Sequence, residues 1–314
     1  MRVLFWGTPE FATPALRALL GEGHEVVGVV TQPDAPGARH RNTLVPPPVK
    51  NVAEEEGIPV LQPERPRGDE FLASLRELAP EISVVAAYGH LLSDAVIAVP
   101  PNGTINIHAS LLPRWRGAAP IQAALLAGDQ ESGVTIMRVE RKLDAGPMLL
   151  HLATPIVEDE TYGELQLRLA ELGALAIVES LALMDIGEVH EEPQDEAKTT
   201  YAPKISREMA HVDWSTSAAH VSRVLRAFDP KPGAYTSKDG AEVKLFGVRV
   251  VLGRRGSPGQ VLEIDESGML VACGEDAVRI GYVFPAGRRR LAALDWRQGR
   301  GVAIGDILGS QGRN

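Results

Sequence analysis

Two polar side chains interrupt the apolar stretch of residues 105–109. Asn106 and His108 are separated by one residue, so in a β-strand they would point to one face while Ile105 and Ile107 pack on the other. An amide donor beside an imidazole is the pair of groups that acyl or formyl transfer needs where negative charge develops on a carbonyl oxygen. A strand histidine that only hydrogen-bonds to backbone fits the same pattern, so the residue types alone leave both interpretations open.

A carboxylate that could reach His108 is Asp144. It follows an apolar strand pattern over residues 133–139 and lies in a loop that contains Gly146. Loop aspartates are most often turn formers. The functional alternative is that the carboxylate orients the imidazole and helps to accept a proton.

A β-α-β pattern opens the chain and predicts the elements that would position these groups. Strand patterns cover residues 2–7 and 25–30, and a helical pattern runs between them from Phe11 to Gly21. This alternation predicts an α/β fold with a doubly wound, mostly parallel, Rossmann-like sheet. The turn after the first strand lacks G-x-G-x-x-G, which argues against a nicotinamide or flavin enzyme.

A further buried strand is predicted over residues 82–89. Its carboxyl end, at Tyr88-Gly-His90, would open on the same sheet edge as His108, where open α/β sheets bind ligands. The loop of residues 31–48 is long for a compact domain and has a basic tip, and such loops are usually functional or disordered.

A polar stretch at residues 187–204 suits a linker, and the pattern of apolar residues changes after it. A helical pattern over residues 215–228 stops at Asp229-Pro230. About five short strands separated by Gly-containing turns follow, and they predict a small antiparallel β-barrel, OB-like in type. We expect an N-terminal catalytic domain over residues 1–189, a linker over 190–208 and an OB-like domain over 209–314.

Composition fits an ordinary folded protein, with 44% hydrophobic and 23% charged residues. No apolar run approaches the roughly 18 residues of a membrane span. The first residues enter a strand pattern at once, unlike a signal peptide, so we expect a cytoplasmic protein. The single cysteine, Cys273, has no internal partner, which fits a reducing compartment. No Cys/His cluster has metal-ligand spacing, so we expect no metal.

Charge divides unevenly along the chain, whose net charge is −9. Residues 1–205 carry 16 Lys and Arg against 29 Asp and Glu, a net charge of −13, whereas residues 206–314 carry 16 against 12, a net charge of +4. A positive module attached to an acidic one predicts that the second part meets a polyanion.

Several stretches resemble a known family. The longest, residues 106–122, reads Asn-Ile-His-Ala-Ser-Leu-Leu-Pro-Arg-Trp-Arg-Gly-Ala-Ala-Pro-Ile-Gln, and it is followed by Gly-Val-Thr-Ile-Met at 133–137 and Leu-Asp-Ala-Gly at 143–146. These residues resemble the formyltransferases that use 10-formyltetrahydrofolate, and Trp115 with residues 118–121 resembles the branch acting on methionyl-tRNA. Shorter stretches agree at residues 7–12, 31–34, 201–205 and 227–230.

The resemblance implies transfer of a formyl group from 10-formyltetrahydrofolate to the α-amino group of methionine on initiator methionyl-tRNA. The product would be N-formylmethionyl-tRNA, used in translation initiation. Asn106, His108 and Asp144 match the family's catalytic residues. We expect a monomer that binds the folate and the tRNA. Lys142, Ala145 and Pro147 depart from similar proteins, which often carry glycine, threonine and aspartate there.

The pterin is expected in the cleft edged by residues 88–92, 110–113 and 140–144, with a candidate cis bond at Leu112-Pro113. The expected folate-binding residues are Tyr88, His90, Leu92, Ser110, Leu111, Leu112, Pro113 and Leu143. The expected tRNA-binding residues are Arg39, Arg41, Arg254, Arg255, Arg288, Arg289 and Arg290.

Two alternatives stay open. A folate-dependent formyltransferase acting on a ribonucleotide or sugar amine would share the three catalytic residues, although the 31–48 loop and the basic second part favour tRNA. A nucleic-acid-binding module without chemistry is opposed by the intact Asn106, His108 and Asp144.

Overall fold

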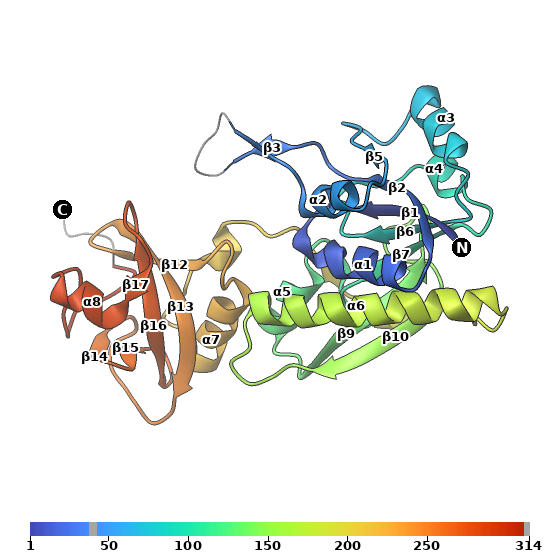
Figure 1. The fold of residues 1–314 in the computed structure, drawn as a ribbon. Coiled ribbons are helices and arrows are strands. Elements are labelled where there is room, and N and C mark those ends of the chain that lie inside the picture. Colours follow the sequence, from blue (N-terminus) through green and yellow to red (C-terminus); the bar gives the residue numbers. More distant parts are fainter. Residues whose placement is uncertain (38–42, 311–314) are drawn as a thin grey trace. The chain divides into compact units, whose positions relative to one another are not determined.

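The computed structural model describes residues 1–37 and 43–310, and the chain divides into two compact units (Figure 1). The first unit comprises residues 1–120, 131–154 and 166–202, and the second comprises 121–130, 155–165 and 203–314. Residues 190–202 therefore group with the first unit. The domain boundaries expected at residues 189 and 208 stay predictions.

The first unit is built on a seven-stranded sheet in the order β10-β9-β7-β6-β1-β2-β5. Its strands are β1 (Arg2–Gly7), β2 (Glu25–Val30), β5 (Val60–Leu61), β6 (Ile82–Ala86), β7 (Thr104–His108), β9 (Glu131–Arg138) and β10 (Met148–Pro155). The five strands from β5 to β7 pair in parallel, and β9 is antiparallel to β7. The predicted doubly wound, mostly parallel sheet is confirmed.

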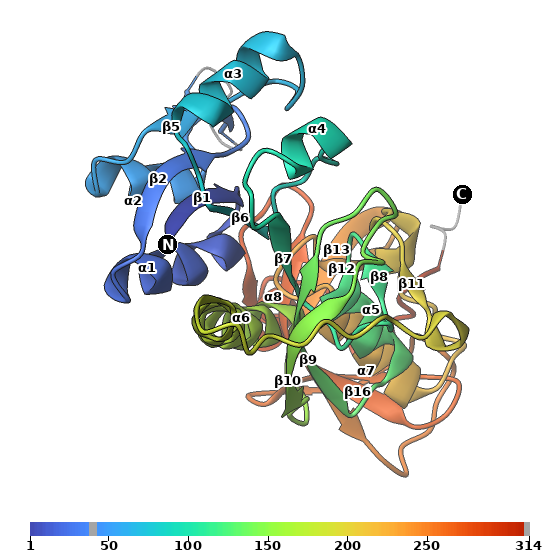
Figure 2. The same cartoon turned by 90° about the vertical axis from the view of Figure 1, so that its right-hand side faces the viewer.

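Helices cover both faces of this sheet (Figures 1 and 2). The helices of the first unit are α1 (Thr13–Gly21), α2 (Pro48–Glu55), α3 (Asp69–Glu77), α4 (Asp94–Ile97) and most of α6 (Tyr162–Asp185), with short 3-10 turns η1 (Glu10–Ala12) and η2 (Glu196–Lys198). Nearly all of α5 (Pro120–Ala127) groups with the second unit. Two small ladders add β3 (Ala35–Pro36) to β4 (Leu44–Val45), and β8 (Arg116–Gly117) to β11 (Tyr201–Ala202). The first ladder forms the stem of the 31–48 loop.

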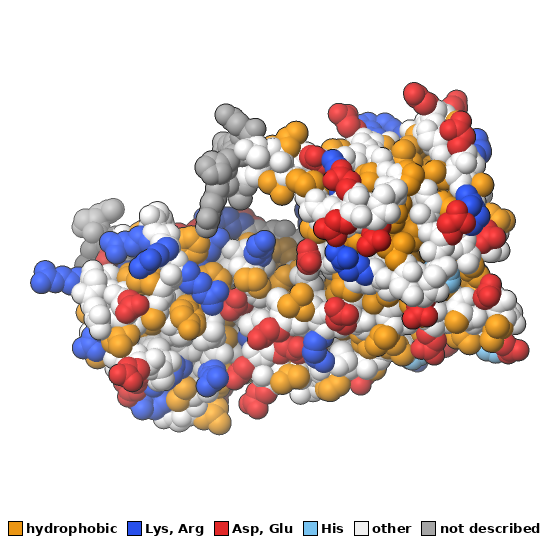
Figure 3. Space-filling model, viewed as in Figure 1, with side chains coloured by type: hydrophobic (Ala, Val, Ile, Leu, Met, Phe, Trp, Pro, Cys, Tyr) orange, Lys and Arg blue, Asp and Glu red, His pale blue; other side chains and the backbone are white. Residues whose placement is uncertain are grey.

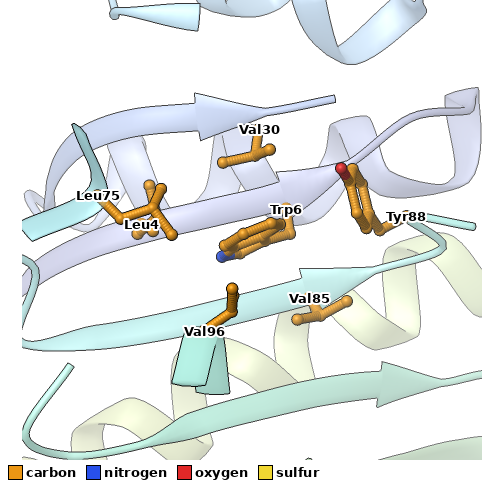
Figure 4. Close-up of a cluster of buried hydrophobic side chains, with 7 residues drawn as sticks. All are labelled: Leu4, Trp6, Val30, Leu75, Val85, Tyr88 and Val96. Atoms are coloured by element: carbon orange, nitrogen blue, oxygen red, sulfur yellow. The ribbon is translucent and has the colours of Figure 1, made fainter. Parts of the chain in front are cut away.

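One row of register partners crosses the sheet. Val30, Trp6, Val85, Asn106 and Met137 face one another in turn on β2, β1, β6, β7 and β9. Partners in a ladder project to the same face, so an amide stands where its row neighbours are apolar. Figure 4 shows part of this row packed in a core cluster with side chains of α3 and α4.

The opposite face of β7 packs against α6. A Cβ on Gly173 of α6 would lie 2.8 Å from Cγ2 of Ile107, so only glycine allows this close approach. Ile105 and Ile107 are buried. The alternation predicted for this strand, with its polar groups on the other face, is therefore confirmed.

The second unit contains an antiparallel sheet in the order β12-β13-β16-β15-β14, with β17 beside β16. Its elements are η3 (Glu208–Ala210), α7 (Ala218–Ala227), β12 (Ala234–Lys238), β13 (Ala241–Val251), β14 (Val261–Asp265), β15 (Gly268–Ala272), β16 (Ala277–Pro285), β17 (Leu291–Ala292) and α8 (Ala293–Gln298). Ser217 caps α7 by accepting a hydrogen bond from the His220 N–H, and the helix ends two residues before Asp229-Pro230. The predicted antiparallel second part is confirmed.

None of the helices in the described ranges is long and apolar enough to span a membrane.

Candidate active site

The side chain of Asn106 is half-buried on the face of the sheet that carries the Trp6 cluster. Within residues 1–37 and 43–310 its amide has no hydrogen-bond partner. A half-buried amide that makes no hydrogen bond with the protein has lost part of its hydration without a replacement from the protein, which costs stability. Such a group is suited to bind something that the protein itself does not supply.

His108 is buried, and its orientation is set by a backbone carbonyl. Its Nε2 lies 2.9 Å from the carbonyl oxygen of Trp115. A carbonyl only accepts, so Nε2 carries the proton in the neutral ring and Nδ1 presents a lone pair. Trp115 has a φ of +61°, which is rare for a bulky residue. The residue whose carbonyl holds the imidazole therefore has an unusual backbone conformation.

Asp144 faces the free nitrogen of this ring. Its Oδ2 lies 3.8 Å from Nδ1 of His108 and accepts a hydrogen bond of 2.8 Å from the N–H of Gly117. The φ of Asp144 is +49°, a left-handed conformation that aspartate tolerates better than most residues. The structure thus brings the His108 imidazole and the Asp144 carboxylate together. The Asn106 amide lies on the same strand as His108, two residues before it.

Gly117 is required by two features of its position. Its φ is +120°, and a Cβ there would lie 2.5 Å from the carbonyl oxygen of Ala202. A side chain would push β8 away from β11, and with it the N–H that holds Asp144.

The predicted folate segment, residues 110–113, is a closed turn. The Leu112-Pro113 bond is cis, as expected from the sequence. Ser110 Oγ donates to the carbonyl of Arg114 at 2.6 Å, and Thr135 Oγ1 donates to the carbonyl of Ser110 at 2.7 Å. Leu112 is buried in a cluster with two methionines. Backbone groups of this segment are engaged as well: the Leu112 N–H donates to Thr135 Oγ1, and the carbonyls of Leu111 and Pro113 accept hydrogen bonds from the N–H groups of Arg114 and Thr200. Most polar groups of the turn are therefore held within the protein.

The other predicted folate residues differ in their surroundings. Tyr88 is buried edge-to-face against Trp6 at 5.3 Å, and burial raises the pKa of its hydroxyl to about 12. Leu92 packs against the same cluster. His90 is exposed, and Leu143 is 48% exposed. The Tyr88 side chain is thus a core residue, whereas His90 and Leu143 are open to solvent.

The predicted tRNA residues lie in two regions. Arg39 and Arg41 lie outside the described residues. Figure 3 shows Lys and Arg side chains gathered on the visible face of the second unit, whose predicted tRNA-binding residues are Arg254, Arg255, Arg288, Arg289 and Arg290.

These five arginines differ in their contacts. All are exposed, but Arg254 contacts Glu263. Arg290 lies over the rings of Phe246 and Tyr282, at 4.3 and 5.0 Å from their centroids. Arg290 therefore has a packing role of its own.

Residues that the sequence patterns did not predict support the site. Arg116 is fully buried, although the motif around it looks like a basic surface loop. Its Nε donates to Oε1 of Gln194 at 2.9 Å, and Gln194 lies in the stretch expected to be a linker. Thr200, in the same stretch, accepts the Trp115 N–H on its hydroxyl at 2.9 Å. No local pattern marks these residues, because each is polar within a polar or basic run.

Neither a metal centre nor a cysteine nucleophile emerges from the described part of the chain. No three His, Cys, Asp or Glu side chains in those ranges gather as metal ligands do. Cys273 is buried, and burial raises its thiol pKa to about 12, so it stays protonated at neutral pH. The arrangement can polarise a carbonyl and move a proton, with the nucleophile supplied by a substrate.

Similar proteins match this chain from end to end. Residues 1–181 match the family model described as Formyl transferase, and residues 204–301 match its C-terminal domain. A methionyl-tRNA formyltransferase from Magnetococcus marinus is 47% identical over 98% of this chain and 98% of its own length. The chain belongs to the methionyl-tRNA formyltransferase family.

Another relative agrees with this family, and one solved structure shares the fold. A methionyl-tRNA formyltransferase from Pseudomonas paraeruginosa is 47% identical over 98% of this chain and 100% of its own length. HypX from Aquifex aeolicus, solved in complex with tetrahydrofolic acid, superposes with a TM-score of 0.70 at 20% identity, covering 97% of this chain and 48% of that chain. The latter likeness bears on the fold alone. The family resemblance drawn from the motif residues is confirmed.

Proposed function

We propose that this protein transfers the formyl group of 10-formyltetrahydrofolate to the α-amino group of methionine on initiator methionyl-tRNA. The observation that carries the proposal is the grouping of Asn106, His108 and Asp144, with 3.8 Å between Nδ1 of His108 and Oδ2 of Asp144. The relatives at 47% identity bear the name of this activity. The sugar-amine or ribonucleotide alternative is not favoured by those relatives.

Asn106 stabilises the negative charge of the reaction. As the amine nitrogen bonds to the formyl carbon, the carbonyl electron pair moves onto the formyl oxygen. The unused N–H groups of Asn106 donate to that oxygen, in a row of apolar side chains where a hydrogen bond to charge is stronger than in water.

His108 and Asp144 move the proton. The attacking amine must lose one proton, and N10 of the folate must gain one before its bond to carbon breaks. Nδ1 of His108 has the lone pair to accept the first and can return it to N10. The Asp144 carboxylate and the Trp115 carbonyl face the two ring nitrogens and stabilise the imidazolium between these steps.

The surroundings suit a flat donor with hydrogen-bonding edges. Bound 10-formyltetrahydrofolate supplies the formyl group on N10. Leu143 offers exposed apolar surface, and Gly89, with a φ of +94°, presents backbone without a side chain. The backbone groups at residues 88–92 would bind the pterin edges.

One assay tests the proposed function. We expect the protein, incubated with 10-formyltetrahydrofolate and charged initiator tRNA, to release tetrahydrofolate and to block the methionine amine. An amino sugar linked to a nucleotide serves as the competing acceptor. Formylation of the sugar amine without formylation of methionyl-tRNA would overturn the proposal.

Two exposed arginines of the second unit are expected to bind tRNA phosphates. We expect R288E/R289E to weaken tRNA binding and to lower the slope of log K against log salt by about 2, one for each lost phosphate contact. Arg290 is left in place because its packing on two rings would confuse the result. The measurement is a binding titration at several salt concentrations.

A matched control changes the same charge elsewhere. R67E/R76E reverses two exposed arginines at and before α3 in the first unit, and it should leave the salt slope unchanged. An equal slope for R288E/R289E and the unaltered protein would remove these residues from the interface.

A further inference from the structure

The amide of Gln194 is fully occupied at the base of the Asp144 loop. Its Nε2 donates to the carbonyl oxygens of Asp144 and Gly146, at 2.9 and 2.8 Å. Its Oε1 accepts the hydrogen bond of 2.9 Å from Nε of Arg116. Both N–H groups of the Gln194 amide therefore bind backbone carbonyls of the Asp144 loop.

Arg116 lies between the Gln194 amide and Gly117, the residue whose N–H binds the Asp144 carboxylate. The guanidinium is fully buried, and its Nη2 lies 3.0 Å from Oε1 of Glu196, whose Oε2 lies 2.8 Å from Nζ of Lys142. Hydrogen bonds lower the pKa of the Glu196 carboxyl, and the one from Lys142 has a larger effect than the one from Arg116. The next residue, Gly117, donates its N–H to Oδ2 of Asp144.

The Asp144 loop needs such support, because its backbone is held away from ordinary conformations. This holds for Asp144, whose φ is +49°. At Gly146 the constraint is one of space, because a Cβ there would lie 2.1 Å from the carbonyl oxygen of Arg138. Residues in sparsely populated conformations keep them only when their surroundings impose them. Rotation of the peptide planes that Gln194 binds would turn the Asp144 side chain away from His108.

We propose that Gln194 is a positioning residue for formyl transfer: its amide fixes the backbone of the Asp144 loop and so keeps the carboxylate at His108. This inference rests on the proposed function, since it takes Asp144 to serve the reaction. The proposed role of Gln194 involves no contact with a substrate. Gln194 acts through the two carbonyls, so its loss should affect turnover and not substrate binding.

The first variant is Gln194→Met, which keeps the length of the side chain and removes every hydrogen bond. We expect kcat to fall on the order of 10- to 100-fold, because a misplacement of about 1 Å can cost that much. KM for the tRNA and for the folate should change by less than about two-fold. A second variant, Gln194→Glu, keeps an acceptor for the buried Arg116 while removing both donors, and we expect the same loss of kcat.

Two controls separate positioning from general weakening. Gln62→Met removes the same kind of amide, which donates to the carbonyl of Gln32 and to Asp34 at 2.8 Å each, in the same unit. It should keep the normal kcat. Asp144→Asn tolerates the left-handed backbone and loses only the charge, and in that background Gln194→Met should have no further effect on kcat.

The outcomes distinguish this inference from the proposed function. If Asp144→Asn lowers kcat at least about 100-fold while folded Gln194→Met or Gln194→Glu keeps the normal kcat, the positioning role is overturned and the proposed function stands. An equal loss from Gln194→Met with and without the Asp144 charge would also overturn it. Normal turnover in Asp144→Asn would instead contradict the proposed role of that carboxylate.

Discussion

Asn106→Leu should abolish most of the formyl transfer while leaving the protein at least as stable. The turnover is expected to fall about 10²- to 10³-fold, the usual effect of removing one donor to a developing negative charge. Leucine has nearly the shape of asparagine and joins a row that already contains Val30, Trp6, Val85 and Met137. Losing an amide that has no described partner removes a desolvation cost, so the thermal unfolding midpoint should not drop.

A loss of turnover without a loss of stability separates this prediction from a general weakening of the fold. Asn51→Leu, at an exposed asparagine of α2, is the matched control and should leave turnover unchanged. Asn106→Asp keeps the size but replaces the donors with a charge that repels the oxygen, and it should be at least as impaired as Asn106→Leu. Turnover within about ten-fold of normal in Asn106→Leu would exclude the amide from charge stabilisation.

His108→Gln should reduce turnover by about 10²- to 10⁴-fold, the usual contribution of a positioned acid-base group. The glutamine amide can still donate to the Trp115 carbonyl, which His108 contacts through Nε2 at 2.9 Å. It cannot accept and return a proton where Nδ1 faces Asp144. The loss should therefore appear in kcat, with KM for both substrates little changed.

A second substitution and a control complete this experiment. His108→Ala should show a comparable loss of kcat, with some loss of stability because the buried hydrogen bond between the imidazole and the Trp115 carbonyl is lost. His151→Gln changes an exposed histidine on β10 and should behave as the unaltered protein. Near-normal kcat in His108→Ala would refute the role of the imidazole.

The sequence suffices for features that depend on periodicity. The strand at residues 104–108 alternates with period two, so the shared face of Asn106 and His108 follows from backbone geometry. The parallel sheet follows in the same way from the alternation of strands and helices. Asp144 is different, because its approach to His108 depends on how one loop folds back: the residue pattern left a turn former as the more frequent interpretation, and the family resemblance then assigned it to the site.

Other features depend on contacts that no single-sequence pattern encodes. Gln194 lies in a polar run that looks like a linker, and its role becomes visible only when the carbonyls of Asp144 and Gly146 face it. Arg290 belongs to a run of three arginines, yet the pairing of β13 with β16 places two rings beneath it. Tyr88 ends a predicted strand at the ligand edge, but its ring turns into the core.

The short ladder between β8 and β11 bears on any attempt to shorten this protein. Residues 201 and 202 supply one of its two strands, and their segment also supplies the acceptors for the N–H groups of residues 115, 116 and 118. A fragment ended at residue 189, where composition alone would place the cut, would lack that strand and also Gln194. An excised first unit intended to keep its working geometry should extend through Ala202.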